Sequence, residues 1–307
     1  MSDIASSFAG ETPAAYAVTG SSVRDYLELL KPRVMSLVVF SGFVGLMVAP
    51  GHIHPLLGFV AILCIALSAG GCAAVNMWYD RDIDSIMLRT RRRPLPQGRV
   101  EPQAAVEFGS ALILLSVALM GLAISWLAAG LLAFAAAFYV YVYTMWLKRR
   151  TPQNIVIGGA AGAFPPVIAW AAVTGHVALP AVILFLIIFF WTPPHFWALA
   201  LYRNEDYTRA GVPMMPVVKG ERRTKIEMLV YTLILFPLSL APAFTGIGGR
   251  IYLSGAALLS GLFILCAIRV LRDKTHKSAR QMFTYSLFYL TTLLCLLLLE
   301  QAIKAWA

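Results

Sequence analysis

Three polar side chains recur at four-residue intervals in the segment Asn76-Met77-Trp78-Tyr79-Asp80-Arg81-Asp82-Ile83-Asp84. On a helix, Asn76, Asp80 and Asp84 would share one face, with successive members about 6 Å apart along the axis. Mg²⁺ is usually held by one or two carboxylates together with substrate phosphates. We therefore expect Asp80 and Asp84 to hold Mg²⁺ with Asn76 beside them. Asp82 falls about half a turn away and is expected to serve another purpose.

A basic cluster, Arg89-Thr90-Arg91-Arg92-Arg93, follows this acidic row. One guanidinium group can donate two parallel hydrogen bonds to the oxygens of a phosphate. An acidic row beside a basic cluster is the combination that a magnesium–diphosphate substrate requires. The expected diphosphate contacts are Asn76, Arg89, Arg93, Lys148 and Arg203. Two plainer alternatives stay open: a solvated loop with scattered charge, and arginines that only set the orientation of the chain in a membrane.

A second polar segment contains Glu205 and Asp206, downstream of Pro193-Pro194-His195. The proline pair is expected to interrupt a helix, and such breaks within membranes mostly face protein or a cavity. If the helix then continues, His195 and Asp206 look into one cavity, with His195 deeper by roughly 16 Å. Asp206, and with it Glu205, is expected to hold a second Mg²⁺. The alternatives are a packing histidine and a surface acid pair.

The elements that must position these residues are membrane helices. Hydrophobic residues make up 59% of the 307 residues and charged residues 13%, against roughly a quarter charged in soluble domains. We expect an all-α membrane protein with a disordered tail at 1–22 and one intramembrane domain at 23–307. An acidic motif after the second span of each half favours a duplication of two four-helix halves plus a ninth helix. The nine predicted spans are 33–50, 56–76, 104–124, 127–146, 154–174, 179–201, 228–247, 251–270 and 283–303.

The positive charges lie on one side of these predicted spans. The formal net charge is +10, and 23 of the 25 Lys and Arg residues fall before the first span or in alternate loops. The positive-inside rule places the N-terminus and the polar segments in the cytoplasm and the C-terminus outside. This distribution explains the charge without a nucleic-acid partner. The four cysteines form no Cys-x-x-Cys pair, which argues against structural zinc and disulfides.

The chain resembles the UbiA-type superfamily of intramembrane prenyltransferases over nearly all of residues 24–303, and within it the branch that farnesylates haem. The strings that carry the resemblance are Lys31-Pro32-Arg33-Val34-Met35, the segment from Asn76 to Asp84, Arg93-Pro94-Leu95, Leu147-Lys148-Arg149-Arg150-Thr151-Pro152-Gln153-Asn154, Pro193-Pro194-His195-Phe196-Trp197, and Asp206-Tyr207 with Ala210-Gly211-Val212-Pro213.

The resemblance implies nine helices around a central cavity in a bacterial inner membrane, with two acidic motifs facing each other on the cytoplasmic side. It implies Mg²⁺-dependent transfer of farnesyl from farnesyl diphosphate to a vinyl group of haem b, with addition of water. Asp80, Asp84, Asp206 and His195 are then the expected catalytic residues, and His195 is also the candidate haem contact. A haem-handling or oxidase-assembly partner is a further expectation, while the oligomeric state is not indicated.

One departure from the superfamily pattern concerns the second motif. The wider superfamily often has two aspartates four residues apart there, but Tyr202 stands four residues before Asp206. Other functions also stay open. The prenyl acceptor could be an aromatic acid or a quinone precursor, with the same transfer reaction. A broken-helix transporter would move a ligand without covalent change. A structural assembly factor would need neither motif.

Overall fold

The computed structural model describes residues 20–306, so most of the predicted tail at 1–22 lies outside the described residues. Every regular element in the described part is helical. In chain order the elements are α1 (Val23–Leu29), α2 (Pro32–Val48), α3 (Pro55–Tyr79), α4 (Arg81–Ile86), α5 (Pro102–Ala123), α6 (Trp126–Ala137), the π-helix η1 (Phe138–Leu147), α7 (Asn154–Ala163), α8 (Pro165–Thr174), α9 (Leu179–Tyr202), α10 (Asn204–Arg209), α11 (Met215–Leu240), the 3₁₀ helix η2 (Ala241–Phe244), α12 (Arg250–Arg272) and α13 (Lys277–Trp306).

The predicted all-α membrane architecture is confirmed. Within residues 20–306, eight helical stretches are long and apolar enough to cross a membrane, and α1 with α2, bent by 56°, provides a ninth. Each predicted span coincides with one of them. The third and fourth spans are joined by a tight turn, because α5 ends at Ala123 and Ser125 caps the start of α6.

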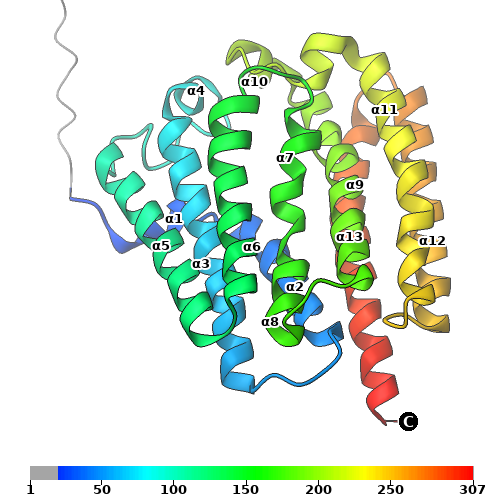
Figure 1. Cartoon of the computed structure of the whole chain (residues 1–307). Helices are drawn as coiled ribbons and strands as arrows, with labels where there is room; N and C mark the ends of the chain where they lie inside the picture. The colour runs from blue at the N-terminus through cyan, green and yellow to red at the C-terminus, as the bar shows by residue number, and fades with distance from the viewer. Residues whose placement is uncertain (1–19, 307) are drawn as a thin grey trace, which may run out of the picture.

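The long helices lie side by side, with α4 and α10 at one end of the bundle and the C-terminus of α13 at the other (Figure 1). Helix α3 packs mainly against α5, whereas α9 packs against α7, α11 and α13. We call the end that carries α4 and α10 the motif end, because both polar segments lie there. The two segments are thus brought to one end by helices from different halves of the chain.

A pair of glycines fixes the position of α3, the helix that leads into the acidic row. A Cβ atom on Gly71 would lie 2.5 Å from the carbonyl oxygen of Gly109, and one on Gly109 would lie 2.7 Å from that of Gly71. Small residues of this kind allow membrane helices to approach closely. Any larger side chain at either position would force α3 and α5 apart and displace the acidic row.

The two proline pairs behave differently. The helix breaks before Pro165, where α7 gives way to α8. The predicted interruption at Pro193-Pro194 is wrong, because α9 runs through both prolines to Tyr202. Neighbouring helices can stabilise an interior proline in a membrane. The helix instead ends at Arg203, whose backbone (φ −117°, ψ 19°) separates α9 from α10. His195 and Asp206 therefore do not lie on one continuous helix.

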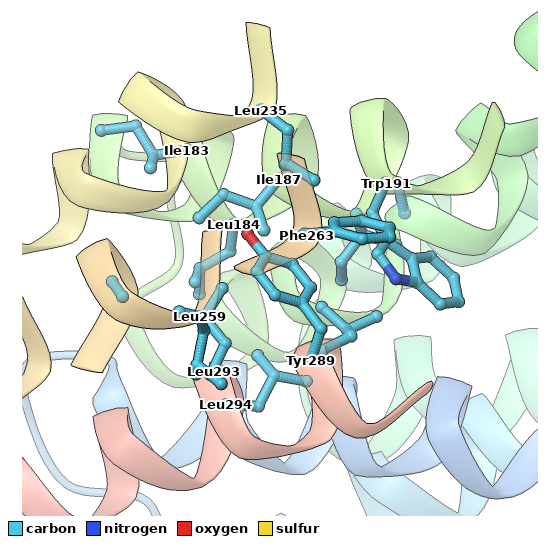
Figure 2. Close-up of a cluster of buried hydrophobic side chains, with 14 of the residues drawn as sticks. Ile183, Leu184, Ile187, Trp191, Leu235, Leu259, Phe263, Tyr289, Leu293 and Leu294 are labelled. Carbon is cyan, nitrogen blue, oxygen red and sulfur yellow. The ribbon is translucent and has the colours of Figure 1, made fainter. Parts of the chain in front are cut away.

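A densely packed apolar cluster joins α9, α11, α12 and α13 (Figure 2), and its members include Leu184, Leu235 and Phe263. Tyr289 lies within it. The Tyr289 hydroxyl is 2.6 Å from Ser239 Oγ and 3.1 Å from Ser260 Oγ. Polar groups buried in an apolar interior must find partners within the protein. This small network therefore ties α11, α12 and α13 together without exposing a polar atom to lipid.

Candidate active site

The row of Asn76, Asp80 and Asp84 persists in the structure even though α3 ends within it. Asp80 joins α3 to α4 with φ −90° and ψ 6°. The Asp80 amide donates to the Asn76 carbonyl at 3.0 Å, and the Asp84 amide donates to the Asp80 carbonyl at 2.8 Å. The three residues are only 4%, 0% and 3% exposed. They share one buried face, as the four-residue spacing predicts.

Each member of the row contacts a basic side chain. The contacts are Lys31 Nζ to Asn76 Oδ1 (3.0 Å), Lys148 Nζ to Asp80 Oδ2, and Arg93 Nη1 to Asp84 Oδ2 (2.6 Å). The structure thus brings two of the predicted diphosphate contacts, Arg93 and Lys148, onto the acidic row. Because buried carboxylates require compensating charge, the cations hold the row together within the protein.

Lys31 reaches the row from the start of α2. Its backbone is left-handed (φ 49°), immediately before Pro32. A lysine seldom adopts this conformation, and such strain tends to occur at functional sites. The Lys31 ammonium group contacts Asn76 on the acidic row, where it can meet an incoming anion.

Lys148 is positioned by the π-helix η1, which it directly follows. Burial lowers the pKa of Lys148, but the charge of Asp80 outweighs this effect, so the pKa is raised overall. On the same helix, Thr144 Oγ1 accepts a hydrogen bond from Asn76 Nδ2 at 3.2 Å. A Cβ atom on Gly158 would lie 2.1 Å from the Tyr143 ring. Gly158 thus allows η1 to approach α7 closely, and π-helical turns of this kind are frequent at functional sites.

Asp82 lies apart from the row, as predicted. Its carboxylate accepts two hydrogen bonds from Arg149, each at 2.7 Å, and its side chain is 59% exposed. The hydrogen bond from Arg149 lowers the pKa of Asp82. Arg149 also donates to the Tyr79 carbonyl at 2.9 Å. This outer ion pair fastens the end of α3 to the loop after η1.

The second polar segment meets the first through the residues that follow α4. Asp206 is buried in α10, and its Oδ1 accepts a hydrogen bond from the Leu88 amide at 3.4 Å. Arg89 Nη2 donates to the Tyr207 hydroxyl at 3.4 Å, and its guanidinium lies 5.9 Å from the centre of that ring. The two acidic motifs are therefore neighbours at the motif end.

Glu205 and Arg203 do not join this arrangement. Glu205 is exposed and, among residues 20–306, has neither an ion pair nor a side-chain hydrogen bond. Arg203 is also exposed, and its guanidinium lies 5.7 Å from the centre of the Tyr202 ring rather than on the acidic row. Adjacent residues on a helix cannot face the same way. Only one member of the acid pair, Asp206, is turned inward.

His195 is buried on α9 and faces α13. Its ring stacks between Trp191 (centroids 4.4 Å apart) and Phe283 (4.6 Å apart). Its Nδ1 is 2.6 Å from Ser286 Oγ, and this hydroxyl also lies 2.7 Å from the Phe283 carbonyl. If the hydroxyl donates to the carbonyl, Nδ1 carries the proton and Nε2 is the free acceptor. The surroundings are those of a packed and oriented histidine.

The carboxylates suit a metal that arrives with its substrate. Within residues 20–306, no three His, Cys, Asp or Glu side chains gather closely enough to hold a metal by themselves. Asp80 Oδ1 is nevertheless buried without a hydrogen-bond partner, and Arg149 Nη2 lies 3.6 Å from it. Mg²⁺ needs few carboxylates when phosphate oxygens complete its coordination. The donor set therefore fits a magnesium–diphosphate complex better than a resident ion.

Sequence reasoning did not assign roles to three residues that shape the site. Lys31 and Thr144 bond directly to Asn76, and Tyr207 accepts from Arg89. Lys31 carried a detectable signal, because a lysine directly before a proline at the start of an apolar span must lie at the membrane boundary. Thr144 carried none, since a hydroxyl within an apolar run more often bonds to its own helix.

Comparison with known proteins identifies one family. The model described as "UbiA prenyltransferase family" matches residues 38–293. A relative from Parvibaculum lavamentivorans named "Protoheme IX farnesyltransferase" is 54% identical over 305 residues, which cover 98% of this chain and 96% of the relative. A relative of the same name from Agrobacterium fabrum is 57% identical over 88% of this chain and 86% of its own.

Solved structures show the same fold at low identity. A digeranylgeranylglyceryl phosphate synthase superposes with a TM-score of 0.76 at 21% identity, covering 91% of this chain and 98% of the other. A UbiA homologue from Archaeoglobus fulgidus, solved with GPP and Mg²⁺, gives a TM-score of 0.63 at 19% identity over 89% and 99% of the two chains. At this identity the similarity supports the arrangement of the helices alone.

Proposed function

This chain belongs to the UbiA prenyltransferase family, and from that premise we propose that it transfers a farnesyl group from farnesyl diphosphate to a vinyl group of protohaem IX (haem b), giving haem O. The observation that carries the proposal is the buried row of Asn76, Asp80 and Asp84 with a cation on each member. A prenyl diphosphate brings several negative charges and a metal to one place, and this row can accept both. Relatives over 50% identical along nearly the whole chain carry the name of that reaction.

The bond changes balance with water as a co-reactant. The bond between farnesyl C1 and the diphosphate oxygen breaks, and C1 joins the terminal carbon of the vinyl group. Water then adds to the inner vinyl carbon, and one proton is released. Diphosphate leaves with the electrons of the broken bond, so the site must stabilise negative charge as it develops.

The polar residues of the motif end supply that stabilisation. Asp80 and Asp84 would hold Mg²⁺, with Asp206 as the candidate ligand of a second ion. When bound, Mg²⁺ supplies positive charge to the departing diphosphate. Arg93 and Lys148 exchange their carboxylate partners for phosphate oxygens as the substrate arrives. Arg89 sits between the two motifs, where it contacts the same anion.

His195 is proposed to position the haem. The side chain lies on α9, outside the acidic row, and its ring is fixed by stacking and by the Ser286 hydroxyl. A fixed imidazole can hold a flat substrate more accurately than a mobile one. This role separates the half of the site that holds diphosphate from the half that holds haem.

The motif end is proposed to face the cytoplasm of a bacterial inner membrane. Lys and Arg gather at the helix ends and loops of this end, whereas Arg250 starts α12 and Lys304 lies near the end of α13 at the opposite side. Basic loops stay on the cytoplasmic side during insertion. The polar diphosphate head group of the substrate could then reach the site from the cytoplasm without crossing the bilayer.

Pigment analysis tests the proposal. Membranes containing the chain are supplied with haem b, farnesyl diphosphate and Mg²⁺, and the extracted pigments are identified by mass spectrometry. We expect a product heavier than haem b by one farnesyl unit plus water, and none from membranes containing Asp84→Asn. Prenylated 4-hydroxybenzoate in a parallel reaction, with haem b unchanged, would overturn the choice of acceptor. Uptake of substrate without any covalent product would favour a transporter.

A further inference from the structure

A polar cavity at the motif end is separate from the acidic row. It lies where the end of α9 meets the loop between α12 and α13, and its volume is about 560 Å³. Arg203 lies immediately before α10, so the cavity adjoins the helix that carries Asp206. The residues that line the cavity are Tyr202, Arg203, Thr275, His276, Lys277 and Arg280.

The cations of this cavity lack acidic partners. Arg203, Lys277 and Arg280 form no ion pair and donate no side-chain hydrogen bond to any residue of the described range 20–306. His276 is paired with Glu221 at 3.2 Å. On the acidic row, by contrast, each cation is matched by a residue of the row. Three uncompensated positive charges around one cavity suit an anion with more than one negative charge.

Lys277 and Arg280 lie in the first turn of α13, and the loop that precedes this turn has a fixed shape. Asp273 accepts hydrogen bonds from the Thr275 and Ser278 amides, both at 2.7 Å. Its carboxylate is thus used to cap α13 and does not neutralise the cavity. Lys225 Nζ donates to the Asp273 carbonyl at 2.8 Å, and His276 takes a left-handed backbone (φ 60°). A rigid and locally strained loop is typical of a preformed binding site.

A row of aromatic rings leads from the cavity into the membrane. Tyr202 packs edge-on against Phe283 with ring centres 6.0 Å apart, and Phe283 stacks on His195 at 4.6 Å. The Arg203 guanidinium lies 5.7 Å from the Tyr202 ring centre. Tyr202 and His195 are seven residues apart on α9, or about 10 Å along the helix. This distance is comparable with that from a haem iron to its propionate carboxylates.

We propose that this cavity binds the propionate carboxylates of haem through Arg203, Lys277 and Arg280, an inference that rests on the proposed function. Haem b carries its propionates on one edge of the macrocycle and its vinyl groups on the opposite edge. Anchoring the propionate edge here directs the vinyl edge away from the cavity and along the motif end. Arg203 is thereby assigned to the haem rather than to the diphosphate.

A lipid head group is the main competing occupant, because clusters of basic residues next to a membrane helix attract anionic lipids. The geometry favours haem. The cavity adjoins the second acidic motif, and the aromatic row connects it to the buried His195. A flat, apolar and dianionic ligand needs both the cations and the rings.

The experiment compares haem b with iron protoporphyrin IX dimethyl ester, in which the propionate charges are removed. The purified full-length chain is placed in phosphatidylcholine nanodiscs, and both ligands are titrated by visible absorption. We expect haem b to bind at least about tenfold more tightly than its ester, because each charged contact contributes strongly. Arg203→Gln and Arg280→Gln should weaken haem b binding and leave ester binding unchanged, so that this ratio falls toward one.

Matched controls are Arg272→Gln and Lys274→Gln, which lie in the same region outside the cavity lining and should keep the ratio of the unmodified chain. Each variant is first checked by thermal unfolding. Equal binding of haem b and ester by the unmodified chain would overturn the proposal, as would variants that weaken both ligands equally. A raised KM for farnesyl diphosphate with an unchanged ratio would assign the cavity to diphosphate instead.

The test also separates this inference from the proposed function. If the unmodified chain makes the farnesylated product but does not distinguish haem b from its ester, the cavity assignment alone is wrong. If the unmodified chain binds neither porphyrin and makes no haem product, the proposed function is wrong and the inference falls with it. Restoring the ratio with Arg280→Lys would support a charge-based contact. Repeating the titration with phosphatidylglycerol added to the nanodiscs tests the lipid alternative. If the cavity binds a lipid head group, the ratio of haem b affinity to ester affinity should be the same in the variants as in the unmodified chain.

Discussion

The two acidic segments at the motif end hold their charge in different ways. The first lies where α3 passes into α4, and its three residues are buried with a cation or amide contact on each. The second lies on the six-residue helix α10, buries Asp206 but not Glu205, and meets the first through the Leu88 amide. The first is a complete electrostatic unit before substrate binds, whereas the second is a single carboxylate held by a neighbouring loop.

This difference shows how a site can be prepared for a substrate that brings its own metal. Buried carboxylates without compensation are strongly unfavourable, so the first segment carries Lys148 and Arg93 as internal counter-ions. Both cations can turn to phosphate oxygens once Mg²⁺ reaches the carboxylates. The second segment has less to rearrange, because within residues 20–306 the Asp206 carboxylate contacts only the Leu88 amide, at 3.4 Å, and a distant Arg209 at 4.0 Å.

The largest expected effect is the loss of a carboxylate from the first segment. Asp84→Asn should lower turnover by about 10³-fold, because it removes a metal ligand and leaves Arg93 without its partner. The rate of haem O formation at saturating Mg²⁺ measures this. The matched control is Asp82→Asn, because Asp82 lies about half a helical turn away from the row. Near-normal turnover by Asp84→Asn in protein with an unchanged melting temperature would contradict the assignment of the row to metal.

The helices of the first segment could be predicted, and so could two of its cations, Arg93 and Lys148, but the residue that each cation contacts could not. Apolar runs of about 20 residues mark the spans directly, and the four-residue spacing places Asn76, Asp80 and Asp84 on one face. Lys31 meets Asn76 across 45 positions of sequence, and Lys148 meets Asp80 across 68. Such pairs depend on how the helices pack, which the periodicity of any single helix does not contain.

The second segment was harder to predict because its geometry depends on where α9 ends. Proline normally breaks a helix, and this rule placed the break at Pro193-Pro194, about ten residues too early. Adjacent Glu205 and Asp206 cannot both face inward, but the sequence does not say which one does. The end of α9 at Arg203 decides in favour of Asp206.

The second expected effect tests that choice. Asp206→Asn should lower turnover by about 10²-fold and raise the Mg²⁺ concentration needed for half-maximal rate, because a single ligand of the second ion is lost. Glu205→Gln should change turnover by less than about threefold, as expected for an exposed and unpaired side chain. Titrations of Mg²⁺ with both variants make the comparison. Equal losses from the two variants would show that Glu205 turns inward when substrate binds.

A smaller effect is expected at His195, on the haem side of the site. His195→Ala should raise the KM for haem b by about tenfold, roughly the contribution of one hydrogen bond and its packing, while the KM for farnesyl diphosphate stays the same. Ser286→Ala removes only the Nδ1 contact and should give a weaker change of the same kind. Steady-state kinetics with each substrate varied in turn measures the split. If the KM values for both substrates are unchanged in His195→Ala, His195 does not position the haem and serves only in packing.

The smallest expected effect concerns the outer ion pair of the first segment, Asp82 with Arg149. An exposed pair contributes only about 0.2–1 kcal/mol, so Asp82→Asn should lower the unfolding temperature slightly and leave turnover within about twofold. The pH dependence gives the sharper test. Because Arg149 lowers the pKa of Asp82 below its ordinary 3.8, the pair stabilises the folded chain above that value. The contribution disappears as the pH falls through the lowered pKa.

The stability difference between the unmodified chain and Asp82→Asn should therefore be constant near neutral pH and vanish in acid. Thermal unfolding in detergent across this range measures it. A loss of turnover as large as that of Asp84→Asn would mean that Asp82 belongs to the reacting unit after all. In that case the first segment would extend beyond the buried row to Asp82. Arg149, which contacts both Asp80 and Asp82, would then be the cation that joins the outer pair to the row, and the first segment would no longer be compensated by its buried contacts alone.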